Sequence, residues 1–356
     1  MRVPARMSAL AALGARRDAA VRAAGAVCAV SLAVAAAHAL NLSDTWWAAI
    51  TAFVVPDASL RGSLTRGVLR ILGTLCGAAL GVLLGTAFQL DGALFVVLIG
   101  VATWAGLYLA HTQRFSYAWL LFIITFVMVL CEAWTARGEL VHFALERCAN
   151  VAVGIVASLV VEGAFALALR RPHAPAKAGA ASAATRRAAA LHALQGAIAV
   201  ALFALLLTWH QLQPLAQAMV TALAVLIVPL GVDAQEAHPH VRQRMVLRLG
   251  GCAVAVLLAL ALLPLLEGRA IACQLALALG VAAGGWVQHR VPAWRYAAIQ
   301  FSVAFIMVFV QDRGWTVHPE AALARLAGIV VGVVLMLVVM SIWAWLARGL
   351  RRRGVP

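Results

Sequence analysis

Long apolar segments joined by short basic connections constrain this chain more than any other feature. Crossing the hydrocarbon core takes about 20 apolar residues in a helix. The chain is 64% hydrophobic and 12% charged, whereas soluble domains are about half apolar and a quarter charged. This apolar surface cannot be hidden in one core, so we expect an all-α polytopic membrane protein with about twelve transmembrane helices. The predicted spans are 25–40, 45–56, 68–88, 92–110, 117–134, 142–169, 188–209, 214–231, 245–266, 269–287, 296–311 and 320–347.

The second six spans repeat the first six. Three motifs recur in the same order at an offset of 178 or 179 residues, which favours duplication. They are Arg66–Gly73 with Arg244–Gly251, Tyr117–Val129 with Tyr296–Val308, and Arg147–Gly154 with Arg325–Gly332. Six spans per repeat make the two halves parallel. We therefore expect a first repeat at 1–169 and a second at 188–356.

Residues 170–187 read as a cytoplasmic linker. The stretch holds two prolines, small residues and five basic side chains, and it is too short for a soluble domain. Nearer the start, Ala37-His38-Ala39 imitates a signal-peptidase site. The first span has a counterpart at 188–209, so we expect it to be retained.

Basic residues are distributed unevenly over the connections. All but five of the 28 Lys and Arg residues lie on the side that also holds both termini; the exceptions are Arg137, Arg147, Arg269, Arg313 and Arg325. Cytoplasmic loops carry this excess of positive charge. We expect cytoplasmic termini and a bacterial inner-membrane location.

The third span carries glycines at four-residue spacing. Gly73, Gly77, Gly81 and Gly85 fall on one helical face, where a second backbone can approach closely. Only the first glycine is kept in the second half, as Gly251. We expect this face to be a packing device.

The motifs at 46–81 carry a family resemblance. Trp46-Trp47-Ala-Ala-Ile-Thr51, Arg66-Gly67 and Arg70-Ile-Leu-Gly73-Thr-Leu-Cys-Gly77 resemble the bacterial fusaric acid resistance and aromatic acid exporter family, which is related to plant aluminium-activated malate transporters. The resemblance implies an inner-membrane transporter of organic anions, usually aromatic carboxylic acids. It also implies, for several members, a periplasmic adaptor protein as partner.

Two repeated arginine pairs are candidates for a substrate gate. Arg66 and Arg70 begin the third span, and Arg244 and Arg248 take the equivalent place in the second half. Arginines at a span end can simply anchor it to lipid headgroups. A guanidinium fork also suits a carboxylate, so an anion gate is the functional alternative.

Arg147 and Arg325 oppose the charge bias at matching places in the sixth and twelfth spans. A costly charge kept in both halves suggests a role facing the helix bundle. An ion pair with an acidic residue is the structural alternative, and the candidates are Glu132, Glu146 and Asp312.

The short second span combines aromatic and hydroxyl side chains. Trp46 and Trp47 could form an interfacial aromatic belt, or they could face a central site together with Thr51. Ionisable residues on the predicted inner side, candidates for proton coupling, are Asp57, Glu162 and Asp233.

Motifs for other chemistries are missing. Asp233–His240 has metal-ligand residue types without cysteines or a counterpart, so we expect no metal. No phosphate-binding loop, nucleophile elbow or H-E-x-x-H motif occurs, which argues against an enzyme or a resident cofactor. Cys131 and Cys148 could pair, although sequence cannot fix their separation.

These observations favour a secondary transporter that exports organic anions across the lipid bilayer. A passive organic-anion channel and a non-transporting membrane scaffold remain alternatives. Nucleic acid is not an expected partner, since the basic residues are used by the bilayer. Homo-oligomerisation stays open.

Overall fold

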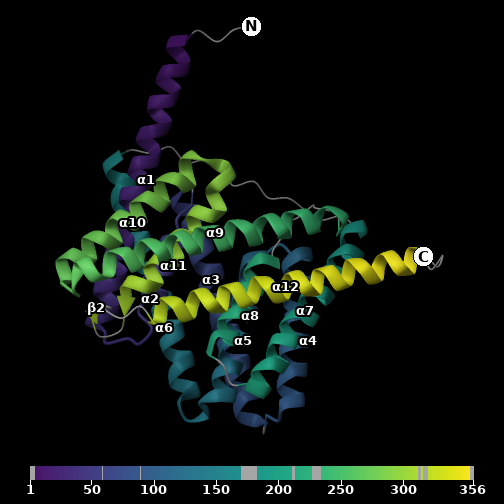
Figure 1. The fold of residues 1–356 in the computed structure, drawn as a ribbon. Helices are drawn as coiled ribbons and strands as arrows, with labels where there is room; N and C mark the ends of the chain where they lie inside the picture. The colour runs from purple at the N-terminus through teal and green to yellow at the C-terminus, as the bar shows by residue number, and fades with distance from the viewer. Residues whose placement is uncertain are drawn as a thin grey trace. The chain divides into compact units, whose positions relative to one another are not determined.

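The computed structural model describes residues 5–57, 59–88, 90–169, 183–210, 213–226, 234–311, 314–315 and 320–352. Side chains at several helix ends, that of Arg325 among them, lie outside this description. Figure 1 labels the elements in chain order. Their bounds are α1 Ala5–Ala39, α2 Trp46–Val54, α3 Leu60–Ala87, α4 Gly92–Thr112, α5 Ser116–Thr135, α6 Leu140–Leu169, α7 Ala183–His210, α8 Gln213–Leu226, α9 Ala234–Leu266, α10 Ala270–Arg290, α11 Arg295–Phe309 and α12 Glu320–Arg352, with two 3-10 turns, Arg137–Glu139 and Pro292–Trp294.

The predicted all-α membrane fold is confirmed. Of the twelve α-helices in the described residues, ten are long and apolar enough to cross a membrane. The other two, α2 and α8, have nine and 14 residues. At 1.5 Å per residue the shorter helix reaches about 14 Å, roughly half of the hydrocarbon thickness.

Several helices begin earlier than the apolar pattern predicts. The third span was expected from residue 68, but α3 begins at Leu60 and includes Arg61 and Arg66. Arginine is a good helix former and can extend its head group away from apolar surroundings. The helix therefore continues past the apolar segment. Next to α11, a minimal antiparallel hairpin pairs Val310 with Trp315 and Gln311 with Gly314.

Contacts divide the chain into two compact units, each built from both halves of the sequence. Unit 1 comprises residues 1–67, 149–175 and 247–322, and unit 2 comprises 68–148, 176–246 and 323–356. In unit 1, α1 packs against α2 and α10, and α11 packs against α2 and α10. In unit 2, α7 packs against α8 and α4, and α5 packs against α8 and α4.

The two units can be compared at matched positions, which lie 178 residues apart along most of the chain and 170 apart in the first two helices of each half. Gly154 of α6 packs against Ala48 and Thr51 in unit 1. Gly332 of α12 packs against Ala218 and Thr221 in unit 2. The predicted division into repeats at 1–169 and 188–356 stays a prediction.

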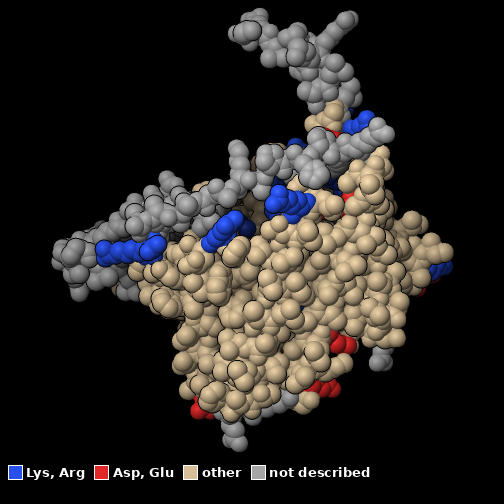
Figure 2. Space-filling view, turned by 180° about the vertical axis from the view of Figure 1, so that it is seen from behind, with Lys and Arg blue, Asp and Glu red and all other residues tan. Residues whose placement is uncertain are grey.

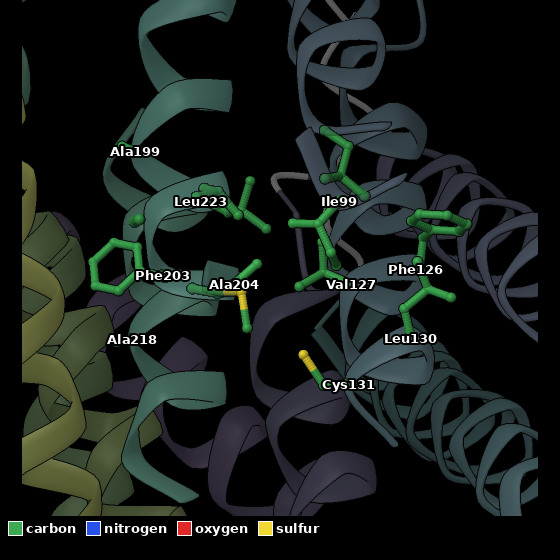
Figure 3. Packing of buried hydrophobic residues seen from close by; sticks show 14 of the residues in the cluster. Ile99, Phe126, Val127, Leu130, Cys131, Ala199, Phe203, Ala204, Ala218 and Leu223 are labelled. Atoms are coloured by element: carbon green, nitrogen blue, oxygen red, sulfur yellow. The ribbon is translucent and has the colours of Figure 1, made fainter. Parts of the chain in front are cut away.

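Each unit has a core of tightly packed apolar side chains. In unit 2, buried side chains from α4, α5, α7 and α8 form one cluster, in which Leu223 points toward Ile99 and Val127 (Figure 3). In unit 1, alanines of α1 and α2 pack with Ala157 and Val161 of α6. The surface seen in Figure 2 is largely uncharged, as a lipid-facing surface must be.

Candidate functional site: a polar pocket in unit 1

A polar pocket opens where the chain leaves α2 and enters α3. Its volume is about 340 Å³, at the lower end of the range for small-ligand pockets. A smaller recess of about 120 Å³ shares part of its wall and extends to Glu162 and Phe165 of α6. Both are lined by Arg22 of α1, by Pro56 and Asp57, and by His289 of α10. Gln288, Pro292 and Arg295 complete the larger pocket.

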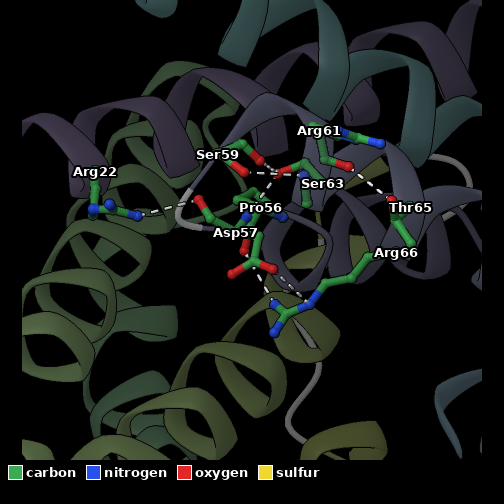
Figure 4. Close-up of polar contacts among 9 residues, drawn as sticks. Arg22, Pro56, Asp57, Ser59, Arg61, Ser63, Thr65 and Arg66 are labelled. Atoms are coloured by element: carbon green, nitrogen blue, oxygen red, sulfur yellow. Dashed lines mark hydrogen bonds and ion pairs between the residues drawn. The ribbon is translucent and has the colours of Figure 1, made fainter. Parts of the chain in front are cut away.

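Asp57 connects two of the arginines. Its carboxylate Oδ2 lies 3.4 Å from Nε of Arg66, and both side chains are little more than one-third exposed. Arg66 Nη1 also donates to the Pro56 carbonyl oxygen at 3.4 Å. From the other side, Arg22 Nη1 donates to the Asp57 carbonyl oxygen at 3.2 Å (Figure 4). The connection between α2 and α3 is thus held by guanidinium groups of two helices.

Hydroxyl groups fix the start of α3 around Asp57. The Asp57 amide donates to Ser63 Oγ at 2.7 Å, and the buried Ser63 hydroxyl donates to the Ser59 carbonyl oxygen at 3.2 Å. Gly62 packs against the Asp57 side chain, and a Cβ there would lie 2.9 Å from Oδ2. Glycine at position 62 therefore leaves room for the carboxylate.

Glu162 enters the recess from α6. Its carboxylate interacts with the Ser63 side chain, the Asp57 backbone and the charges of Arg22 and Asp57. Its Oε2 atom is buried and has no hydrogen-bond partner among the described residues. Burying a carboxylate oxygen without a hydrogen-bond donor costs free energy of folding. Glu162 is therefore a candidate for a functional role.

The pocket as a whole can bind an anion. Arg22 and Arg295 line the larger pocket, whose one lining carboxylate among the described residues, Asp57, is itself paired with Arg66. In the described part of the chain, Arg22 donates to a backbone carbonyl and makes no ion pair within 4 Å, which leaves guanidinium N–H groups for a ligand. Guanidinium forks bind carboxylates in bidentate fashion.

The four predicted gate arginines take different places. Arg66 lies at the pocket, whereas Arg70 is buried in unit 2 and donates to the Tyr117 hydroxyl at 2.9 Å. Arg248 is buried in unit 1 and donates to Gln300, while Arg244 is half-buried in unit 2. Of this set only Arg66 lies beside the pocket, through its ion pair with Asp57, and a common gate of all four stays a prediction.

The side chains of the short second helix lie inside the protein. Trp46 and Trp47 are buried with ring centroids 4.1 Å apart, and Trp46 Nε1 donates to Asp44 at 3.0 Å. Thr51 is fully buried against Gly154. Burial of both rings disfavours an aromatic belt at the lipid interface. A role in the substrate pathway stays a prediction.

Two further sets of predicted residues can be located. Arg147 is buried in α6, whereas the side chain of Arg325 and Asp312 lie outside the described residues, as do the side chains of 233–239. The α3 glycines face α5: a Cβ on Gly73 would overlap the Ala118 carbonyl oxygen, and one on Gly77 that of Phe122. All six cysteines are free, so the considered pairing of Cys131 with Cys148 is absent.

Sequence reasoning named Asp57, Glu162 and Arg66 but missed Arg22, Ser63 and His289 as members of one site. These residues come from α1, α3 and α10, and only packing brings them together. A signal was available for His289, because His111 occupies the matched position 178 residues earlier.

Unit 2 has a closed counterpart of this pocket. It is lined by His192, Gln195, Leu226, Val241, Met336 and Met340, and it has no room for a water molecule. His192, matched to Arg22, donates a 2.8 Å hydrogen bond from Nε2 to the Leu226 carbonyl oxygen. Val241 replaces Ser63, and Met340 replaces Glu162. The ionisable pocket thus occurs at only one of the two matched places.

The ten long apolar helices within the described ranges define a multi-pass α-helical membrane protein. The chain belongs to the fusaric acid resistance protein family, whose pattern matches residues 21–201. That match includes Arg22, Asp57, Ser63 and Glu162, but it ends before His289.

Curated relatives share a shorter stretch. The chain is 30% identical over 158 residues to the p-hydroxybenzoic acid efflux pump subunit AaeB of Musicola paradisiaca (strain Ech703), which covers 39% of this chain and 24% of the relative. It is 29% identical over 153 residues to the protein of the same name from Salmonella arizonae, covering 39% and 23%. The matched part thus spans about a quarter of the length of these relatives. No solved structure matches the chain.

Proposed function

We propose that this chain is a membrane efflux transporter for organic anions, foremost aromatic carboxylates, and that the pocket of unit 1 binds them. The observation that carries the proposal is the arginine-rich pocket at Asp57 in a member of this family. Relatives named as p-hydroxybenzoic acid efflux pump subunits support the choice of substrate class. An enzymatic role has no support from them.

The charge of the substrate suits export. We place the protein in the bacterial inner membrane with both termini in the cytoplasm, following the distribution of arginines. A monoanion leaving a cell with a negative interior gains about 2.3 kcal/mol for each 100 mV of membrane potential. A reporter fused to either terminus that became active outside the cytoplasm would contradict this orientation.

A parallel duplication of six helices fits the matched helix pairs of the two units. An adaptor protein and assembly of several copies are compatible with transport but have no support in the described residues. Co-purification with a periplasmic partner and mass measurement in detergent would test them.

Transport in reconstituted vesicles tests the function directly. We expect labelled p-hydroxybenzoate to cross only with the protein present, and Arg22→Gln to lower the rate at least tenfold, because a charge-assisted hydrogen bond contributes about 1.5–3 kcal/mol. Arg16→Gln is the matched control, since Arg16 is exposed on the same helix and does not line the pocket.

Three outcomes would separate the alternatives. Equal flux in protein-free vesicles would refute transport of this substrate. Single-channel currents in planar bilayers would favour a passive channel. Full transport activity of Arg22→Gln would show that the substrate binds outside the pocket.

A further inference from the structure

The recess beside Asp57 has a single set of hydrogen-bond donors and an anion already facing it. Ser63, the Asp57 amide and the guanidinium of Arg22 are the groups that interact with the Glu162 carboxylate. The Ser63 hydroxyl already donates to the Ser59 carbonyl oxygen and the Asp57 amide to Ser63 Oγ, so the guanidinium of Arg22 is the donor of this group that an incoming carboxylate can use. Ligand and side chain therefore meet at the same guanidinium.

Two ionised carboxylates cannot share that place at low cost. Like charges a few ångströms apart in a poorly solvated site disfavour ionisation of both. Glu162 already leaves Oε2 without a partner among the described residues, so no further donor stands ready to hold it beside a second anion. Binding of an anion then requires that Glu162 be neutralised.

We propose that Glu162 is a built-in competitor of the transported anion, so that unit 1 binds one carboxylate together with one proton. This inference rests on the proposed function, because it assumes that the pocket receives an organic anion. It adds the regulation of the site: without a ligand the Glu162 carboxylate interacts with the positive charge of Arg22, and protonation of Glu162 leaves that charge to the ligand.

The matched site in unit 2 supports a single competitor per chain. Met340 takes the place of Glu162 and Val241 that of Ser63, and the site is closed. A second proton-linked anion site of this kind is therefore missing from the described part of unit 2.

Other charged or titratable groups lie around the recess and the pocket, and their effects on anion binding must be distinguished from that of Glu162. Arg22 comes from α1, Asp57 from the α2–α3 connection, Arg66 from α3, His289 from α10 and Arg295 from the start of α11. Among these residue types, histidine is the one whose charge commonly changes near neutral pH. Protonated histidine would favour anion binding in the same direction, so it needs its own variant.

The experiment measures binding of p-hydroxybenzoate to the purified full-length protein from about pH 6 to about pH 8, where a free carboxylate stays ionised. For the wild type we expect the dissociation constant to rise with pH by up to about tenfold per unit, the limit for linkage to one proton. Glu162→Gln should bind at least tenfold more tightly at the upper end and lose this slope.

Two controls make the assignment specific. Met340→Leu, at the matched position in unit 2, should keep the wild-type slope within about twofold. His289→Gln should also keep the slope. Loss of the slope in His289→Gln, or its persistence in Glu162→Gln, would overturn the proposal for Glu162.

The wild type alone gives a second test if Glu162→Gln fails to fold. Titration calorimetry in two buffers of different ionisation enthalpy should report uptake of about one proton per bound anion near neutral pH, also in His289→Gln. No proton uptake would refute the inference while leaving the proposed function intact. Absence of p-hydroxybenzoate binding at every pH would instead count against the proposed function itself.

Discussion

The polar pocket of unit 1 and the closed site of unit 2 occupy matched positions, but the first is lined by charged side chains and the second mostly by apolar ones. Arg22 and Glu162 line open space in unit 1, whereas the matched His192 and Met340 line a closed site in unit 2. Contacts between helices are the same in both units, as the glycines at 154 and 332 illustrate. Packing and pocket chemistry can thus diverge independently within one framework.

The largest expected effect comes from placing the unit 1 carboxylate into unit 2. Met340→Glu should destabilise the protein by about 3 kcal/mol or more, because the closed site offers no solvent to a buried charge. Thermal unfolding in detergent would measure the change. Met340→Leu, which conserves volume, should cost less than about 1.5 kcal/mol. Equal stability of the two variants would show that unit 2 is open after all.

The next effect tests what the units share. Gly73→Ala in unit 2 and Gly251→Ala in unit 1 should each cost about 1–3 kcal/mol, because a Cβ would overlap the carbonyl oxygen of Ala118 or Ala297. Gly250→Ala is the control, since nothing lies near a Cβ at that position. Loss of stability in only one of the first two variants would break the equivalence of the packing. The measurement is again unfolding in detergent.

A third prediction concerns matched arginines with different partners. Tyr117→Phe removes the acceptor of Arg70, and Gln300→Met removes that of Arg248. Each should cost about 1.5–3 kcal/mol, because a hydrogen bond to a buried charged group is lost. Tyr108→Phe serves as the control in unit 2, where the ring stacks on Trp104. Stabilities unchanged from wild type would mean that the two arginines do not depend on these acceptors.

The smallest effect on stability is expected at the rim of the pocket. Asp57→Asn breaks an ion pair whose side chains are over one-third exposed, so it should cost less than about 1 kcal/mol. Anion affinity should nevertheless rise severalfold, since a negative charge leaves the wall while Arg66 stays. Equilibrium binding of p-hydroxybenzoate would measure it. Weaker binding would indicate that Asp57 mainly positions Arg66.

Much of the fold could be predicted because the bilayer imposes a simple rule on sequence. The bounds predicted for a long apolar segment agree with the observed helix to within a few residues, as for 92–110 and α4 at Gly92–Thr112. Helix ends rich in arginine could not be predicted, since Arg61 and Arg66 continue α3 without any apolar signal. Which helices make up each compact unit could not be predicted either, because α1 packs against α10, a helix far away in the sequence.

The site could be predicted only in part. Asp57 and Glu162 attract attention as rare acidic residues in an apolar chain, and Arg66 belongs to a repeated motif. In the sequence, Arg22 resembles the other arginines that anchor helix ends, and the residues next to it give no sign of its hydrogen bond to Asp57. The burial of Trp46 and Trp47 likewise depends on neighbours from other helices, which a local pattern does not reveal.

The pairing of α1 with α10 has a consequence for biogenesis. Roughly 230 residues separate the end of α1 at Ala39 from the start of α10 at Ala270, which at 5–20 residues per second means about 10–50 s of synthesis. During that interval α1 lacks its contact with α10, and the nine-residue α2 lacks its contact with α11. Insertion factors or chaperones would have most to protect at this stage, before the last helices leave the ribosome.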